Sequence, residues 1–366
     1  MKTTASRWLL LFVFALGGIL FAGCSRSSAP SKGTSPPPAF SLAWSEYPSW
    51  SVFGVAQDKK LIDGAEGKLG PIEKKWGVDI VLKEAGYDSC LNMYSAKNCD
   101  AVCITNMDVL SPALSLKSVA ILPTSTSAGA DACIVVGIDS VQALRGHKVY
   151  GLENSVSEYC FARNLELSGE KESDHQFTNM DPAAAAVAMQ TKSQEHKAIM
   201  VWNPFVLQTL ADRKDARVLF DSSTIPGEII DMVVMSEASL DKPGGKEFAL
   251  AVIDTYYEMN KLLADKDTGA DTLVALGEKF SRLGLDDMKK AVEQTRFYKS
   301  PDEALALFTG EQLKDTMKTV VGFCVSHQIV PGAPKIGYGD KQATPAVDLR
   351  FDPSYINELA SKGQGG

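Results

Sequence analysis

The chain has 366 residues, of which 45% are hydrophobic, and this is enough to bury the cores of about two or three domains. It carries 37 Lys and Arg against 45 Asp and Glu, a net charge of −8. A general nucleic-acid binder is therefore disfavoured, because neutralising phosphates requires a surplus of basic residues. The 22% of charged residues and 8% of aromatic residues are typical of an ordinary globular protein.

The amino-terminal segment indicates export. Lys2 and Arg7 precede an apolar run over residues 8–21, which is short for a membrane span and is followed by small residues. The run ends in Leu20-Phe21-Ala22-Gly23-Cys24, which resembles the bacterial lipobox except for its phenylalanine. We expect a lipoprotein signal peptide over residues 1–23 and a lipid anchor on Cys24. The alternative is a plain signal peptide that is cleaved nearby, with Cys24 incidental.

Residues 24–38 are rich in Ser, Pro, Ala and Gly and contain no large apolar residue. Such a segment cannot bury surface, so we predict a disordered tether and a folded body that begins near Ala39. No later segment approaches the roughly 18 uninterrupted apolar residues of a spanning helix. The folded body is therefore expected outside the cytoplasm, in the periplasm or at the cell surface, and held to a bacterial membrane by its anchor.

Short β-rich runs alternate with helical runs along most of the body, the pattern of an α/β protein with mainly parallel sheets. The first series predicts strands over 40–44, 78–82, 101–105 and 119–122, and helices over 50–60, 87–95 and 107–114. The second predicts strands over 132–136, 148–151, 175–178, 198–202 and 217–220, and helices over 157–167, 182–192 and 204–211. A strand over 230–235 precedes helices over 245–264, 273–283, 301–308 and 310–327.

Two α/β series followed by a helical tail predict two lobes. Lobe 1 is discontinuous and comprises residues 39–124 and 230–366, and lobe 2 comprises residues 125–229. The chain crosses between the lobes near 124–131 and 221–231, and both crossings are rich in Ser, Thr, Gly and Pro, as hinges can be.

Ligands of open parallel sheets lie beyond the carboxyl ends of the strands, and this rule selects six loops. The loops are residues 44–50, 105–108, 124–131, 153–158, 202–204 and 222–228. The candidate ligand-binding residues within them are Trp44, Tyr47, Trp50, Asn106, Asp108, Asp131, Ser155, Ser157, Glu158, Trp202, Asn203 and Glu228. For each aromatic residue the alternative is a core position, and for each serine it is an ordinary helix cap.

The charges of these loops point to one kind of ligand. None of the six contains Lys or Arg, whereas Glu46, Asp108, Asp131, Glu153, Glu158 and Glu228 supply six acids. An anion would be repelled by such a cleft, and a cationic or urea-like hydrogen-bond donor would be favoured, with cation–π contacts to the aromatic rings.

The sequence offers little support for catalysis, a cofactor or a metal. It has no G-x-S-x-G, HExxH or P-loop motif. Six further cysteines, at positions 90, 99, 103, 133, 160 and 324, show no CxxC or Cys/His spacing. An even number permits disulfides in an oxidising compartment, and Cys90 with Cys99 is the first pair to consider, but buried thiols are the expectation for most.

At these loops the chain resembles the extracytoplasmic solute-binding proteins of ABC importers, in the nitrate, sulfonate and taurine class with the type II periplasmic-binding fold. The resemblance covers about Phe40 to Tyr355. It rests on six segments in order, which are Leu42-Ala43-Trp44 with Tyr47-Pro48 and Trp50, residues 99–108, residues 155–159, Val201-Trp202-Asn203-Pro204, residues 222–229 and residues 351–355. The Asn106-Met107-Asp108, Trp202-Asn203-Pro204 and Ile225-Pro226-Gly227-Glu228 segments are most similar to the branch associated with urea carboxylase pathways.

The resemblance implies a monomer whose lobes close by a hinge on a urea- or guanidine-like solute and deliver it to a membrane permease with its ATPase. It implies that Trp44, Tyr47, Asn106 and Asp108 line one lobe, and that Ser155, Ser157, Glu158, Trp202 and Asn203 line the other. Glu158 stands where many relatives have histidine. Three alternatives stay open. The same fold could hold nitrate, taurine, an alkanesulfonate or a thiamine-pyrimidine precursor, the chain could be an enzyme like the pyrimidine synthases, whose cysteine-rich motif is absent, or it could be a sensor subunit.

Overall fold

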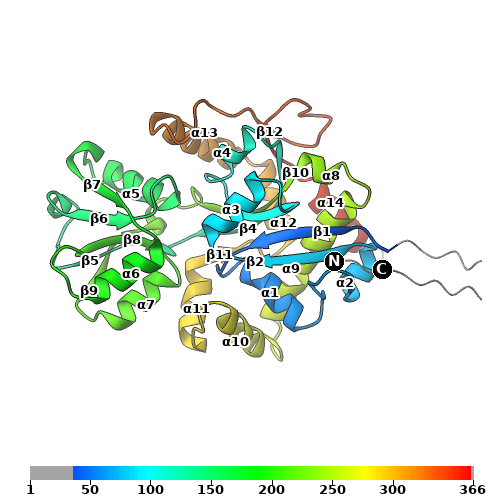
Figure 1. Cartoon of the computed structure of the whole chain (residues 1–366), viewed down its shortest axis with the longest axis horizontal. Coiled ribbons are helices and arrows are strands. Elements are labelled where there is room, and N and C mark those ends of the chain that lie inside the picture. Colours follow the sequence, from blue (N-terminus) through cyan, green and yellow to red (C-terminus); the bar gives the residue numbers. More distant parts are fainter. Residues whose placement is uncertain (1–35, 364–366) are drawn as a thin grey trace, which may run out of the picture. The chain divides into compact units, whose positions relative to one another are not determined.

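Two β-sheets flanked by helices organise the protein (Figure 1). The structure, a computed structural model, describes residues 36–363. The predicted signal peptide, Cys24 and all of the predicted tether before Pro36 lie outside the described residues. From Pro37 onward the chain forms one compact unit, so a protein without the first 35 residues retains the whole described core.

The first sheet has the strand order β12-β13-β4-β10-β3-β1-β2, and β11 also pairs with β4. Its strands are β1 (Ala39–Trp44), β2 (Asp79–Glu84), β3 (Ala101–Thr105), β4 (Ser118–Ser127), β10 (Ile230–Ser236), β11 (Thr295–Phe297), β12 (Ile336–Tyr338) and β13 (Leu349–Phe351). The second sheet has the order β7-β6-β8-β5-β9. Its strands are β5 (Asp131–Val136), β6 (Lys148–Gly151), β7 (Gln176–Asn179), β8 (Ala198–Trp202) and β9 (Ala216–Asp221).

The α/β class with two helix-flanked sheets is confirmed, and both sheets are mixed. β1 pairs in parallel with β2 and β3, and β6 pairs in parallel with β7 and β8. Every antiparallel pair involves β5, β10 or β11. β5 and β10 are the strands that follow the two crossings between the sheets, and each enters its sheet against the direction of its neighbours. The lobe boundaries stay a prediction, although the strands of the second sheet all lie between Asp131 and Asp221.

Helices cover both faces of the sheets. In the second sheet, α5 lies on one face, and α6 and α7 lie on the other (Figure 1). The helices are α1 (Ser51–Asp58), α2 (Pro71–Trp76), α3 (Tyr87–Ser95), α4 (Leu110–Ala113), α5 (Val156–Leu167), α6 (Pro182–Gln190), α7 (Phe205–Asp212), α8 (Glu237–Leu240), α9 (Gly245–Ala264), α10 (Gly269–Lys279), α11 (Leu285–Gln294), α12 (Pro301–Thr309), α13 (Glu311–Ser326) and α14 (Ser354–Gly363). Among these, α2, α8, α11 and α14 were not predicted.

Local chemistry fixes several helix starts. The Asp181 side chain accepts a hydrogen bond from the Ala184 N–H, and Pro182 occupies the first turn of α6. Ser300 caps α12 in the same way, through the N–H of Glu303. No helix within residues 36–363 is long and apolar enough to cross a membrane.

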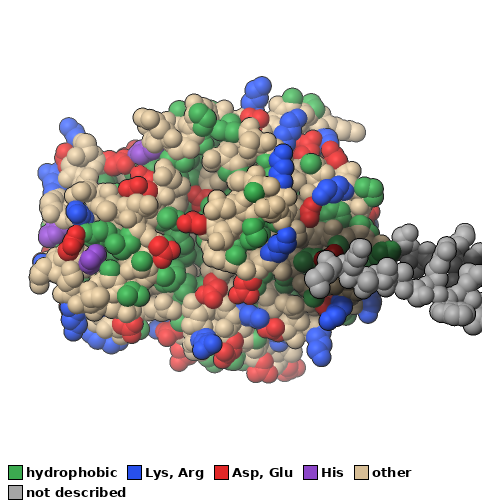
Figure 2. Space-filling model, viewed as in Figure 1, with side chains coloured by type: hydrophobic (Ala, Val, Ile, Leu, Met, Phe, Trp, Pro, Cys, Tyr) green, Lys and Arg blue, Asp and Glu red, His purple; other side chains and the backbone are tan. Residues whose placement is uncertain are grey.

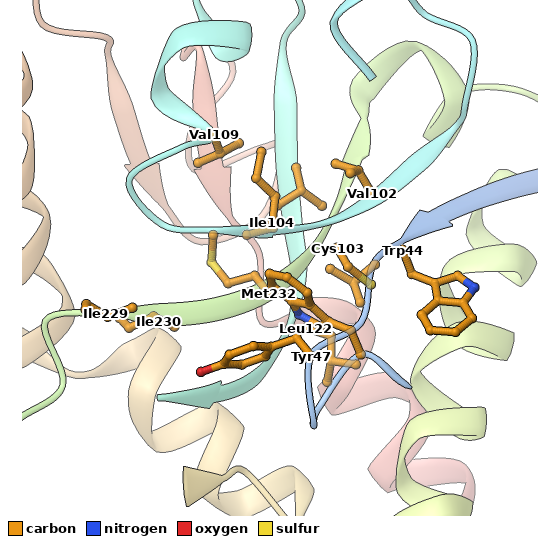
Figure 3. Close-up of a cluster of buried hydrophobic side chains, with 14 of the residues drawn as sticks. Trp44, Tyr47, Val102, Cys103, Ile104, Val109, Leu122, Ile229, Ile230 and Met232 are labelled. Atoms are coloured by element: carbon orange, nitrogen blue, oxygen red, sulfur yellow. The ribbon is translucent and has the colours of Figure 1, made fainter. Parts of the chain in front are cut away.

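The crossings differ from the predicted loops. β4 continues to Ser127 and β5 starts at Asp131, so the first crossing is only residues 128–130. The six cysteines of the described chain are all buried and free, and Cys90 and Cys99 form no disulfide. They pack as small apolar groups within a hydrophobic core that includes Cys103 and Leu122 (Figure 3).

Candidate functional site

A cavity of about 850 Å³ is lined by residues that belong to both sheets and their loops. Tyr47 and Trp50 follow β1, and Tyr87 begins α3 just after β2. Trp202 ends β8 in the second sheet, and Phe205 begins α7. In Figure 2 this face of the molecule is hollowed, and acidic side chains lie beside the hollow. We call these five aromatic side chains the aromatic belt.

The aromatic belt runs without a break from one side of the cavity to the other. The rings of Tyr47 and Trp50 lie 5.0 Å apart, and Trp50 stacks on Tyr87 at 5.6 Å with an interplanar angle of 15°. Tyr87 meets Trp202 edge to face at 6.1 Å, and Trp202 meets Phe205 at 6.4 Å. These distances fall in the range of favourable aromatic pairs, so each ring fixes the next.

Six carboxylates also line the cavity, and among the described residues no Lys or Arg does. Four of them are exposed at its rim, namely Glu46, Glu84, Asp88 and Asp181. The other two, Asp131 and Asp231, are each only 2% exposed. We call Asp131 and Asp231 the floor carboxylates.

Neighbouring serines of β4 hold the floor carboxylates. Ser127 donates to Oδ2 of Asp131 at 2.5 Å, and Ser125 donates to Oδ2 of Asp231 at 2.5 Å. The two serines are two residues apart on one strand, so they point to the same face and bring the two carboxylates to the same region. No described residue donates a hydrogen bond to Oδ1 of either carboxylate.

Burial disfavours the charged form of both floor carboxylates. It raises the pKa of Asp131 to about 6, with Asp108 and Asp221 adding repulsion and the bond from Ser127 opposing the rise. Burial also raises the pKa of Asp231 well above its usual range, and the negative charge of Asp131 adds to the effect. The cavity therefore holds carboxyl groups whose ionised form a positive charge would stabilise.

Two more polar groups at the cavity lack partners among the described residues. The hydroxyl of Tyr47 and the indole N–H of Trp50 are buried and make no hydrogen bond of standard geometry with a described residue. Burial raises the pKa of Tyr47 well above its usual value, and the charges of Asp231 and Asp131 add to this rise. Figure 3 shows the Tyr47 hydroxyl directed away from the hydrophobic cluster. Buried polar groups are nearly always paired, so unpaired ones beside a cavity indicate a place for a ligand.

Four of the residues predicted for the site line this cavity together, namely Tyr47, Trp50, Asp131 and Trp202. The predicted Trp44 does not reach it. Its ring is 1% exposed and points away from Tyr47 (Figure 3). It packs over Gly54 of α1, where an added methyl group would lie 2.8 Å from the ring. Trp44 is therefore a core residue, and the glycine at this position of α1 leaves room for its indole ring.

Three other predicted residues use their polar groups for hydrogen bonds within the protein. Asn106 donates to the Glu228 carbonyl and accepts from the Ile230 N–H. Asn203 donates to the side chain of Gln294 at 2.8 Å. The Glu228 carboxylate accepts two bonds from Arg163, at 2.9 Å each, and a third from Tyr159. None of the three lines the cavity, and Glu228 is neutralised by a base 65 residues away in the sequence.

The remaining predicted residues lie at or near a second, smaller cavity of about 320 Å³, which Asp108 and Ser155 line. It shares Tyr87, Asp88 and Leu152 with the larger cavity. Ser155 is the N-cap of α5 and accepts from the N–H of Ser157. Ser157 is buried with an unpaired hydroxyl, and Glu158 accepts from the Asn154 N–H. Neither Ser157 nor Glu158 lines either cavity.

Sequence reasoning missed Tyr87, Asp88, Asp181, Phe205 and Asp231 as site residues. The first four stand at helix starts, where the chain has just left a strand, and the loop after β2 was not considered. Asp231 stands at the beginning of β10 rather than after the end of a strand. The signal available in the sequence was Gly86-Tyr87-Asp88, a few residues after the strand over 78–82.

The arrangement suits binding of an organic solute. Within residues 36–363 no group of three His, Cys, Asp or Glu side chains could hold a metal ion. The cavity instead offers π faces, carboxylate acceptors and two unpaired hydrogen-bonding groups.

No protein-family model matches the sequence, and no curated protein matches it. Solved structures do resemble the fold. The periplasmic aliphatic sulphonate binding protein of Escherichia coli matches with a TM-score of 0.64 and 19% identity, over 81% of this chain and 95% of that one. The alkanesulfonate-binding protein of Xanthomonas axonopodis bound to MOPS matches with a TM-score of 0.64 and 15% identity, over 82% and 96%.

A ligand-binding component of an ABC-type import system from Staphylococcus aureus, with zinc bound, matches with a TM-score of 0.62 and 11% identity, over 88% of this chain and 99% of that one. At these identities the similarity establishes the fold alone. The chain therefore has the fold of periplasmic binding proteins.

Proposed function

We propose that the protein is the solute-binding component of an ABC importer and that it captures a small nitrogen-containing solute, either a cationic guanidine-like compound or a neutral urea-like hydrogen-bond donor. One observation carries the proposal. The cavity is lined by six carboxylates and five aromatic rings, and no Lys or Arg of the described chain lines it. A cation–π surface with buried acceptors recognises positively charged nitrogen groups.

The proposed ligand differs in charge from the sulfonates named for two of the similar structures. An anion in this cavity would lie beside the floor carboxylates, whose pKa values are already raised because burial disfavours negative charge. A sulfonate stays ionised at neutral pH and would add a further uncompensated charge. A cation removes the same repulsion, so the anion-binding alternative is the weaker one.

We propose that the cavity closes on its ligand because its walls come from both sheets. Tyr47 and Tyr87 belong to loops of the first sheet, while Trp202 and Asp131 belong to the second. A solute that contacts both sets stabilises a closed form, and the short crossings at 128–130 and 222–229 are the proposed hinges. The closed form would dock on the membrane permease, which its ATPase drives. We assign the protein no catalysis.

We also propose that export and lipidation of Cys24 hold the protein at the outer face of a bacterial membrane. The residues 24–38 would serve as the tether, and confinement beside the permease raises its effective concentration. Incorporation of a labelled fatty acid in wild type but not in Cys24→Ser is the expected result. Equal labelling of both proteins would contradict the anchor.

The ligand class is tested with a thermal-shift panel on protein spanning residues 36–366. The panel contains guanidinium, urea, short amides, nitrate, taurine and thiamine pyrimidines. Binding raises the free energy of unfolding by mass action, by about 2.7 kcal/mol at a hundredfold excess over Kd. A shift with the cationic or urea-like compounds, lost in Trp202→Ala, supports the proposal. A shift with nitrate or taurine and none with the nitrogen compounds would contradict it.

A further inference from the structure

The floor carboxylates form an acceptor site for more than one N–H donor. Asp131 and Asp231 come from different sheets, and each keeps an oxygen that receives no hydrogen bond from the described protein. Tyr47 lines the same cavity with a hydroxyl that makes no hydrogen bond of standard geometry, and Tyr47 is itself only 5% exposed. A group with a single N–H could satisfy only one of these acceptors, whereas an ammonium, amidinium or guanidinium group could satisfy two or three at once.

The rest of the cavity has a different character. Tyr87, Trp202 and Phe205 present ring faces and edges next to apolar side chains such as Leu152 and Ile229. The part of a ligand that fills this region must therefore be largely apolar.

The volume of the cavity distinguishes between a small bare cation and a larger organic cation as its ligand. The cavity holds about 850 Å³. A guanidinium ion or a urea molecule has four heavy atoms and occupies roughly the volume of three waters, on the order of 90 Å³. If either molecule were bound at the floor carboxylates, most of the aromatic belt would have no contact with it. Pockets of roughly 300–1,000 Å³ are usual for ligands of drug-like size.

We propose that the solute is an organic cation with two parts, a head with several N–H donors that Asp131 and Asp231 hold, and a flat or aliphatic body that the aromatic belt encloses. This inference rests on the proposed function and narrows its ligand class. The head is an amine, amidine or guanidine protonated at neutral pH. The body is aromatic, heteroaromatic or alkyl.

Isothermal titration of protein spanning residues 36–366 tests the proposal with four probes. Benzamidinium, benzamide and benzoate share one shape and carry positive, zero and negative charge, and guanidinium is the head without a body. We expect benzamidinium to bind about 100-fold more tightly than benzamide, as charge-assisted hydrogen bonds to buried carboxylates require. We expect a similar preference over guanidinium, because stacking on several rings adds to the affinity.

Variants assign the two parts of the ligand to residues. Asp131→Asn and Asp231→Asn keep the side-chain shape and the acceptor for Ser127 or Ser125, and each should weaken benzamidinium at least about 30-fold while barely changing benzamide. Trp202→Ala should weaken both probes. Asp139→Asn is the matched control, since Asp139 is 98% exposed and lies outside the cavity, and it should not change any affinity. Thermal melts of each variant show that it is folded.

Each outcome has a distinct meaning. Benzamidinium binding that depends on both floor carboxylates and on Trp202 supports the inference. Guanidinium binding as tightly as benzamidinium overturns the two-part ligand and leaves the proposed function intact. Benzoate binding more tightly than benzamidinium overturns both. Benzamidinium binding that survives the floor variants, or no binding up to about 10 mM, a range that covers Kd values of about 1 mM and tighter, overturns the inference.

Discussion

The hydroxyl of Tyr87 donates a hydrogen bond of 2.6 Å to Oδ2 of Asp108, and the same oxygen accepts from Thr105 at 2.8 Å. Tyr87 is the ring between Trp50 and Trp202 in the aromatic belt. Asp108 therefore lies behind the belt and orients its central ring. Its pKa is raised to about 6 by burial, against the opposing effect of these two hydrogen bonds.

Tyr87→Phe tests this link. The ring stays and the hydroxyl is lost, so buried Asp108 loses a donor, which costs about 1–3 kcal/mol of unfolding free energy. We expect a lower melting temperature and a severalfold loss of benzamidinium affinity as the ring becomes less constrained. Tyr257→Phe is the matched control, because the Tyr257 hydroxyl is buried without a hydrogen-bond partner and its removal breaks no bond. Equal destabilisation by the two changes would contradict a positioning role for Asp108.

Asp131→Asn should stabilise the unliganded protein near neutral pH although it weakens cation binding. The folded pKa of about 6 lies above the value of about 3.9 in an unfolded chain, so folding favours the protonated form. The stability that this group contributes is fully present below about pH 4 and is lost as the pH rises through about 6, on the order of 3 kcal/mol. Denaturant unfolding from about pH 2 to 8 should show wild type losing stability relative to the variant between about pH 4 and 6.

Asp215→Asn should change the stability in the opposite direction in the same denaturant unfolding experiment. The hydrogen bonds and charge of Arg213 lower the pKa of Asp215 to about 2. Its contribution is present above the unfolded pKa and disappears as the pH falls through about 2, so this variant should be the less stable one at neutral pH and approach wild type in acid. If Asp131→Asn follows the same course as Asp215→Asn, Asp131 is not held in a charge-disfavouring environment.

Cation binding should release protons. Burial favours the protonated form of both Asp131 and Asp231, and a positive head opposes this effect by lowering both pKa values. Benzamidinium affinity should therefore rise as the pH increases through about 6, the pKa of Asp131. Calorimetry in buffers with different ionisation enthalpies measures the protons directly. Proton uptake on binding, or an affinity that falls with rising pH, would contradict the assignment of the floor carboxylates.

Most of the fold could be predicted from the sequence because its elements follow local rules. The helix over Tyr87–Ser95 and the strand over Ala198–Trp202 have the predicted bounds. Hydrophobic runs, caps and prolines mark such boundaries within a few residues of chain. The short helix α2 was missed because Pro71–Trp76 is only six residues long and mostly polar.

The site was harder because it depends on strand direction and on distant partners. The rule that ligands lie beyond strand ends applies to parallel strands. β10 runs antiparallel to β3 and β4, so its first residues, including Asp231, lie at the edge where those strands end. Conversely, Glu228 sits in a predicted loop but pairs with Arg163, and no spacing in the sequence reveals that pair.

Gly54→Ala separates the core role of Trp44 from a role in the site. The new methyl group would lie 2.8 and 2.9 Å from two carbons of the Trp44 ring, and that ring is fully enclosed. We expect overpacking to cost about 1–3 kcal/mol of unfolding free energy, with unchanged benzamidinium affinity. Gly322→Ala is the matched control in α13, where no atom lies within 4 Å of the added methyl group, and it should gain about 0.5–1 kcal/mol. A loss of benzamidinium affinity in Gly54→Ala without a change in stability would instead indicate that Trp44 contributes to the site.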